Sequence, residues 1–228
     1  MGKVRAVCIS EKRGTQKKNI ESAVFVENWG IEGDAHAGNW HRQISLLSEE
    51  TIAAFKARGA EVTDGAFGEN LVVSGYDFTK FPVGTRFTCK DVVLELTQIG
   101  KECHHGCEIF QKMGECIMPT NGVFAKVLHG GKISVGDEFH VQYRAAVITL
   151  SDTASKGERE DASGAAVEEI VRKEGYEVVF KKIIPDDGDS LTALLCELSD
   201  EDKADLILTT GGTGFSKRDN TPEATMRA

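Results

Sequence analysis

The chain has 228 residues and a formal net charge of −9, with 36 acidic against 27 basic side chains. That length suffices for one large domain or for two modest ones, each with its own core. The acidic balance excludes a general nucleic-acid binder, which needs a basic face to release counterions from phosphate. No apolar run approaches the roughly 20 residues that cross a bilayer, so we expect no membrane association.

The first residues alternate like a strand and lack the apolar segment and cleavage site of a secretory signal. We therefore expect a cytoplasmic protein whose six cysteines stay reduced. For reduced cysteines, we expect metal binding or thiol chemistry in preference to a disulfide framework.

Residues 1–143 are rich in short alternating or β-branched runs separated by glycines, which predicts a mainly β domain. The expected strands are Lys3–Ile9, Ala23–Glu27, Gln43–Leu47, Asn70–Val73, Arg86–Cys89 and Val92–Thr97. One helix is predicted from the N-cap Ser48 to a stop at Gly59, and a shorter one over Glu108–Met113. Two similar turns, Val83-Gly84 and Val135-Gly136, each lead into a strand, as in a barrel that folds back on itself.

After Tyr143 the pattern changes to apolar strands that alternate with helices. The expected order is strand Ala145–Leu150, helix Ser163–Glu174, strand Glu177–Ile184, helix Ser190–Leu198 and strand Asp205–Thr209. Such alternation predicts an α/β domain with a parallel sheet covered on both faces. We place the boundary near residue 143, which gives domains 1–143 and 144–228. A last helix is expected to begin near Pro222, and because the chain ends at Ala228 we expect a truncated, partial domain.

The strongest motif is a glycine-rich turn and the polar segment that follows it, Thr209-Thr210-Gly211-Gly212-Thr213-Gly214-Phe215 and Lys217-Arg218-Asp219-Asn220-Thr221-Pro222-Glu223. The turn follows an apolar parallel strand, at the edge where ligands bind in open α/β sheets. Glycines let N–H groups approach a phosphate closely, and a carboxylate such as Asp219 suits Mg²⁺. For a GGTG alone, a turn that merely ends a strand remains the competing interpretation.

The extended run Thr209–Thr225 resembles the signature of the molybdopterin adenylyltransferase family. Three further pieces agree in order and spacing: Ser151-Asp152, Asp161 and Pro185-Asp186-Asp187. The resemblance implies a site that binds molybdopterin and Mg-ATP and joins them as adenylyl-molybdopterin.

By matched position, Asp186 and Asp219 would be the catalytic residues and would hold Mg²⁺. The cofactor would be bound by Ser151, Asp152, Gly211, Gly212, Thr213 and Gly214. A solvated turn is the alternative interpretation of Asp186 and Asp187. The resemblance covers residues 144–228, roughly the first half of such a domain, so we expect adenylyl transfer only from a complete one.

In the first domain, the loop Gly30–Gln43 holds two histidines, one arginine and three glycines. Arginine offers a fork of donors and glycines expose N–H groups, which suits an anionic ligand. His36, His41 and Arg42 are therefore candidate binding residues. The alternative is a loop whose histidines only cap neighbouring carbonyl groups.

A second cluster follows the strand Val92–Thr97 and comprises Lys101-Glu102-Cys103-His104-His105-Gly106-Cys107, with Cys116 further along. Thiolates ligate zinc, molybdenum or iron–sulfur clusters and act in sulfur transfer, and nearby cations lower a thiol pKa. A buried thiol that acts as a small hydrophobe is the usual alternative, and it fits Cys8, Cys89 and Cys196 better than Cys103.

Together these segments resemble the MOSC domain, named for the C-terminal part of molybdenum-cofactor sulfurases. The matching pieces are the Gly-Asp-x-His loop, Phe67-Gly68-Glu69-Asn70-Leu71, Val83-Gly84, Cys103 after its strand, and Val135-Gly136-Asp137. The resemblance implies a β-barrel-like fold with a reactive or molybdenum-ligating Cys103. That cysteine would either carry sulfur from a pyridoxal-phosphate-dependent cysteine desulfurase or ligate molybdenum while the His36–Arg42 loop holds the pterin phosphate.

We therefore expect a protein of molybdenum-cofactor maturation that serves molybdoenzymes and binds molybdopterin or the molybdenum cofactor. No segment resembles a pyridoxal-phosphate lysine site, so a desulfurase would be a separate partner. An exposed edge of the partial sheet could pair with another copy of the chain, and such a homo-oligomer would be a consequence of the truncation. Two alternatives stay open: a binding module stabilised by zinc on Cys103, Cys107, Cys116 and His104 or His105, and a cofactor carrier without catalysis.

Overall fold

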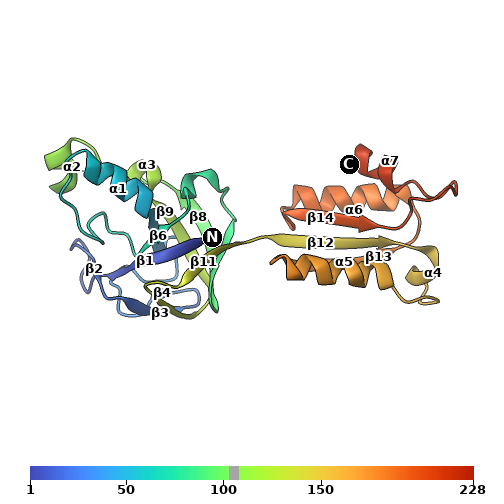
Figure 1. Cartoon of the computed structure of the whole chain (residues 1–228), viewed down its shortest axis with the longest axis horizontal. Coiled ribbons are helices and arrows are strands. Elements are labelled where there is room, and N and C mark those ends of the chain that lie inside the picture. Colours follow the sequence, from blue (N-terminus) through green and yellow to red (C-terminus); the bar gives the residue numbers. More distant parts are fainter. Residues whose placement is uncertain (103–107) are drawn as a thin grey trace. The chain divides into compact units, whose positions relative to one another are not determined.

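The computed structural model describes residues 1–102 and 108–228, so the predicted cluster around Cys103 lies outside the described residues. The chain forms two compact units, Met1–Val141 and Gln142–Ala228 (Figure 1). The predicted boundary at residue 143 lies two positions further along. Within the described residues, no helix is long and apolar enough to span a bilayer.

The N-terminal unit is built on an eight-stranded sheet in the order β11-β7-β8-β9-β5-β6-β1-β2, and a further pairing of β11 with β1 closes it into a barrel. Its strands are β1 (Gly2–Ile9), β2 (Lys18–Asn19), β5 (Ile44–Ser48), β6 (Leu71–Ser74), β7 (Arg86–Cys89), β8 (Val92–Ile99), β9 (Val123–His129) and β11 (Glu138–Gln142). The pairing of β5 with β6 is parallel. A separate small sheet contains β10 (Gly131–Ser134), β3 (Ser22–Val26) and β4 (Gly30–Ile31). The mainly β fold predicted for this half is confirmed.

The helices of this unit are short: α1 (Glu49–Ala57), the 3₁₀ turn η1 (Phe78–Lys80), α2 (Glu108–Met113) and α3 (Met118–Asn121). Helix α1 begins where the sequence predicted, because the Ser48 hydroxyl accepts a hydrogen bond from the Thr51 N–H group. Its Phe55 is fully buried and meets Phe67 edge to face, with ring centroids 5.5 Å apart.

The barrel interior contains a cluster of aromatic side chains among aliphatic ones. Phe87 and Phe139 stack with ring centroids 5.4 Å apart, and Phe78 packs edge-on against Phe87 at 5.4 Å. Tyr76 reaches into the same cluster and donates its hydroxyl to the Phe139 carbonyl at 3.0 Å, so its one polar group is satisfied. This apolar filling leaves ligand-binding groups to the loops at the ends of the strands.

The C-terminal unit is a three-stranded parallel sheet in the order β13-β12-β14, with β12 (Arg144–Leu150) between β13 (Glu177–Ile184) and β14 (Leu206–Thr210). Its helices are α4 (Asp152–Ser155), α5 (Ala162–Lys173), α6 (Gly188–Asp200) and α7 (Thr221–Arg227). Figure 1 shows α5 on one face of this sheet and α6 on the other. The predicted parallel α/β arrangement is confirmed.

The central strand fixes which residues meet at the edge of this sheet. Leu150 pairs with Ile184, and Thr149 pairs with Thr210. The three strands therefore end side by side, and the segments that follow them begin from one edge.

Candidate functional site

The segments after β12 and β13 are tied to each other by two reciprocal hydrogen bonds. The Asp152 N–H group donates to Asp186 Oδ2 at 3.0 Å, and the Asp186 N–H group donates to Asp152 Oδ1 at 3.1 Å. The neighbouring Ser151 caps α4 by accepting from the Ala154 N–H group. The structure thus brings together three residues that the sequence placed in one site.

Arg218 joins this pair, and the sequence analysis assigned it no role. Its guanidinium lies 2.7 Å from Asp152 Oδ2 and 3.0 Å from Asp152 Oδ1, and its Nε donates to the Asp186 carbonyl at 3.1 Å. Its position beside Asp219 in the motif was the only sequence signal. The partner carboxylate is 66 residues away, which no local pattern reveals.

The glycine-rich loop (residues 211–220) starts with a turn that only glycine accommodates. Gly211 and Gly212 have φ of 91° and 62°, and a Cβ on Gly211 would lie 2.1 Å from the Leu150 carbonyl oxygen. The buried Thr221 closes the turn: its hydroxyl donates to the Gly211 carbonyl at 3.0 Å and its N–H group to the Gly212 carbonyl at 3.1 Å. The turn is therefore packed against the end of β12, and the exposed backbone of the loop begins at Thr213.

The remaining predicted residues of this loop are exposed or half-buried. Thr213 and Gly214 are exposed, and the carboxylate of Asp219 accepts from the Ser216 N–H group at 2.9 Å. The buried Oδ1 atom of Asn220 has no hydrogen-bond partner among the described residues, which is uncommon for a buried polar atom. An added group that donates a hydrogen bond would satisfy it.

The two adjacent carboxylates of the Pro-Asp-Asp turn have different environments. Asp187 caps α6, accepting from the Ser190 N–H group at 3.0 Å, and its hydrogen bonds with Ser190 lower its pKa. Asp186 faces Asp152 instead. Asp187 therefore has a purely structural role as a helix cap, and Asp186 remains a candidate residue of the site. Among the described residues, no three His, Cys, Asp or Glu side chains converge as a ready-made metal centre.

In the N-terminal unit, the predicted histidine loop rests on a buried carboxylate, Asp34. This group accepts from the Ser10 N–H group at 3.1 Å, from Lys17 Nζ at 2.7 Å and from Asn70 Nδ2 at 2.9 Å. Burial raises the pKa of Asp34, but the hydrogen bonds from Lys17, Asn70 and the Ser10 N–H group, with the positive charge of Lys17, together outweigh it, so the net pKa is lowered. The loop that carries His36 is therefore anchored by a fixed ion pair.

The three predicted binding residues of that loop, His36, His41 and Arg42, have different environments. His36 Nδ1 lies 3.6 Å from Asp34 Oδ1, and burial and the positive charge of Lys17 lower the His36 pKa. Arg42 lies against the rings of Trp40 and Phe124, 4.9 Å and 5.5 Å from their centroids. Its buried Nε has no hydrogen-bond partner among the described residues.

His41 is exposed, but its backbone connects the loop to the strand before the cysteine cluster. The Thr97 hydroxyl, near the end of β8, donates to the His41 carbonyl and lies 3.1 Å from the Phe124 carbonyl. Strand β8 leads on to residues 103–107, which lie outside the described residues. Of the ligands considered for zinc, Cys116 alone is among the described residues.

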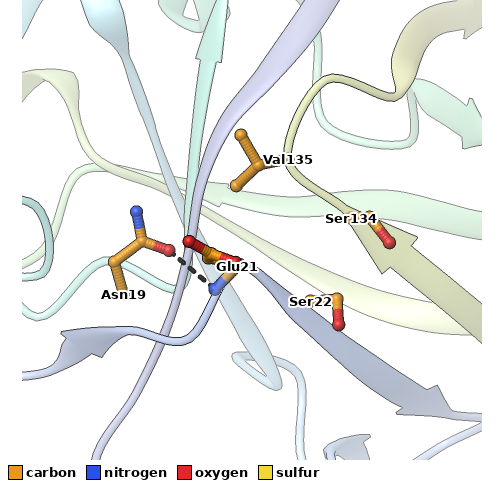
Figure 2. A pocket seen from close by; sticks show the side chains of 5 residues that line it. All are labelled: Asn19, Glu21, Ser22, Ser134 and Val135. Carbon is orange, nitrogen blue, oxygen red and sulfur yellow. Dashed lines mark hydrogen bonds between the residues drawn. The ribbon is translucent and has the colours of Figure 1, made fainter.

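Two shallow depressions of this unit differ in charge. One, of about 280 Å³, is lined by Arg13, His36 and Trp40. The other, of about 500 Å³, is lined by Asn19, Glu21, Ser22, Ser134 and Val135 (Figure 2). Its one charged lining group is the Glu21 carboxylate, so only the first depression suits an anion.

Cys8 and Cys89 are buried, as the sequence predicted, whereas Cys196 is only half-buried. Burial, reinforced by nearby acidic side chains, raises the pKa of Cys8 to about 12 and that of Cys89 to about 11. Both thiols stay protonated near neutral pH and act as small apolar groups.

Glu69, within the Phe67–Leu71 motif, is a buried residue for which the sequence suggested no role. Its carboxyl group accepts from the Gly65 N–H group at 2.7 Å and from the Phe67 N–H group at 3.0 Å. Burial raises its pKa to about 7, because these hydrogen bonds only partly offset the loss of hydration. Glu69 therefore organises the turn at residues 65–69 from inside the fold.

Both units match known families. Residues 33–140 match the MOSC domain, and residues 146–228 match the family described as a probable molybdopterin binding domain. The chain joins a MOSC domain to a molybdopterin-binding-type domain. The YUAD protein of Bacillus subtilis supports the fold of the MOSC domain, with 22% identity and a TM-score of 0.54 over 62% of this chain and 96% of that one.

The C-terminal domain also has curated relatives. It is 45% identical over 82 residues to the molybdopterin adenylyltransferase of Pyrococcus furiosus, covering 36% of this chain and 47% of the relative. It is 40% identical over 86 residues to that of Escherichia coli, covering 36% and 44%. The chain spans about half the length of the curated relatives it matches.

Glu69 predicts a pH-dependent stability of the MOSC domain. Between about pH 4.5 and 7 the folded state keeps a proton that the unfolded state has released, so the free energy of unfolding falls as pH rises. The fall amounts to roughly 3 kcal/mol over this window, and the contribution is constant above pH 7. Urea titrations followed by fluorescence of Trp29 and Trp40 should show that Glu69→Gln lacks this fall.

The exposed Glu61→Gln serves as the matched control and should keep the wild-type pH dependence. His36, whose lowered pKa works in the opposite direction, remains in all three proteins and cancels in the comparison. Equal pH dependence in wild type and Glu69→Gln would contradict the assignment.

The tight turn at Gly211 predicts a large effect of a single methyl group. Gly211→Ala and Gly175→Ala introduce Ala at similar φ, 91° and 88°, but a Cβ at Gly175 meets nothing within 4 Å. We expect Gly175→Ala to cost about 1–2 kcal/mol, and Gly211→Ala to cost clearly more. Hydrogen exchange of the β12 and β14 amides measures the difference, and equal losses would refute the close approach to Leu150.

Proposed function

We propose that this chain acts in molybdenum-cofactor biosynthesis, with the C-terminal domain binding molybdopterin and Mg-ATP at the edge where its three strands end. One observation carries the proposal: Asp152, Asp186 and the Gly211–Gly212 turn converge there from three separate strands. Ligands of open α/β sheets bind at this edge. The identity to molybdopterin adenylyltransferases over this domain supports the choice of ligand.

The residues present suit such a ligand. Thr213 and Gly214 offer exposed backbone that a phosphate can approach, and the unpartnered Asn220 Oδ1 is an acceptor for a donor on the ligand. Asp186 and Asp219 would supply carboxylate oxygens for Mg²⁺, which neutralises phosphate charge when bound. Because the adenylyltransferases are about twice as long as the matched region, we propose ligand binding for this chain and treat adenylyl transfer as an outcome of the test.

For the MOSC domain, we propose that Cys103 handles sulfur or molybdenum of the cofactor, with His36 and Arg42 holding an anionic group nearby. Support comes from Arg42, whose buried Nε has no described partner, and from the depression beside His36. A pyridoxal-phosphate-dependent cysteine desulfurase and molybdoenzymes are the proposed partners. The proposed role of Cys103 itself rests on the sequence.

Asp186→Asn should weaken binding of Mg-ATP to the full chain about tenfold or more, because a carboxylate is lost from the cation site. Asp189→Asn, a substitution of an exposed carboxylate on α6, is the matched control and should bind like wild type. Isothermal titration with Mg-ATP, and fluorescence titration with molybdopterin, measure both. Failure of the wild-type chain to bind either ligand would overturn the proposal, and turnover of both ligands would extend it to adenylyl transfer.

Cys103→Ala should abolish retention of molybdenum or pterin by the purified chain, whereas Cys196→Ala should retain both. Elemental analysis and pterin fluorescence make the comparison. Stoichiometric zinc without pterin, lost in Cys103→Ala, would instead establish the zinc-stabilised binding module. Equal cofactor content in wild type and Cys103→Ala would remove Cys103 from the site.

A further inference from the structure

The glycine-rich loop leaves β14 and returns to α7 with few contacts along its middle. Its first turn is fixed by Thr221, and its far end is tied internally by the bonds between Ser216 and Asp219. Phe215 at its tip is fully exposed. Side-chain anchorage to the strand ends therefore depends on Arg218, through Asp152 and the Asp186 carbonyl.

The geometry of that anchorage is specific to arginine. Two guanidinium nitrogens reach both oxygens of Asp152 at 2.7 Å and 3.0 Å, and a third nitrogen donates to the Asp186 carbonyl at 3.1 Å. A lysine ammonium is a single point charge on a flexible stem and does not reproduce this planar fork. Arg218 therefore sets both the distance and the orientation of the loop relative to β12 and β13.

We propose that Arg218 is a positioning residue: it grips Asp152 and the Asp186 carbonyl, and so holds the glycine-rich loop, with Asp219 next in sequence, in the arrangement that receives the ligand. The identity of the ligand in this proposal rests on the proposed function. The anchorage of the loop by Arg218 does not, because it exists in the protein without ligand.

The pair is open to solvent, with side-chain exposures of 57% for Arg218 and 33% for Asp152. Exposed ion pairs add little to global stability. Loss of Arg218 should therefore loosen the loop without unfolding the domain, which separates positioning from a merely structural role.

The first test uses hydrogen exchange on the full chain without ligand. Arg218→Ala should raise the exchange rate of loop amides, including that of Ser216, about tenfold, with β12 amides unchanged. Arg218→Lys should fail to restore protection. Arg227→Ala is the matched control, since Arg227 is similarly exposed at 53% and pairs with Asp189 on α6. Unchanged loop exchange in Arg218→Ala would overturn the proposal.

The second test measures Mg-ATP affinity in a cycle of Arg218→Ala, Asp152→Asn and the double variant. If Arg218 acts through Asp152, the double variant should bind no more weakly than the weaker single variant. Losses that multiply would show that Arg218 affects binding independently of Asp152 and would overturn a positioning role exerted through this carboxylate. No binding by wild type would refute the proposed function alone, because loop exchange would still decide the role of Arg218.

Discussion

Parallel pairing of β12 with both of its neighbours fixes the edge at which the C-terminal domain can present a site. The register ends all three strands together, so Ser151, Pro185 and Gly211 start their loops side by side. Each loop then bends back within hydrogen-bonding distance of another. If β12 were shifted by one residue, the reciprocal bonds between Asp152 and Asp186 would be lost, and Arg218 would have no paired targets.

In the MOSC domain, a buried ion pair positions the candidate binding loop, as the sheet edge does in the C-terminal domain. Asp34 and Lys17 are held inside the fold, and Asn70 connects Asp34 to the start of β6. A buried charge is tolerated only when its partners are complete, so the histidine loop above Asp34 has little freedom at its base. Arg42 and His36 carry the unpartnered buried nitrogens of that loop among the described residues.

The sequence by itself determined much of the local structure and predicted the class of site. Ser48 and its acidic neighbours define α1, and the alternation after Tyr143 defines a parallel sheet, because capping and apolar periodicity act over a few residues. The glycine motif predicted a binding function for this edge of the sheet. Strand β9 was missed, although glycines flank its Val123–His129 run on both sides, because the run mixes apolar residues with Lys126 and His129 and does not alternate regularly.

Tertiary structure alone decided how distant side chains combine. Arg218 meets Asp152 across 66 residues, and the pKa of the Glu69 carboxyl is raised chiefly because the barrel buries it. It also separated Asp187, which caps α6, from its neighbour Asp186, which faces Asp152. Charge pairing, burial and register are properties of three-dimensional proximity, and a local pattern of residue types does not contain them.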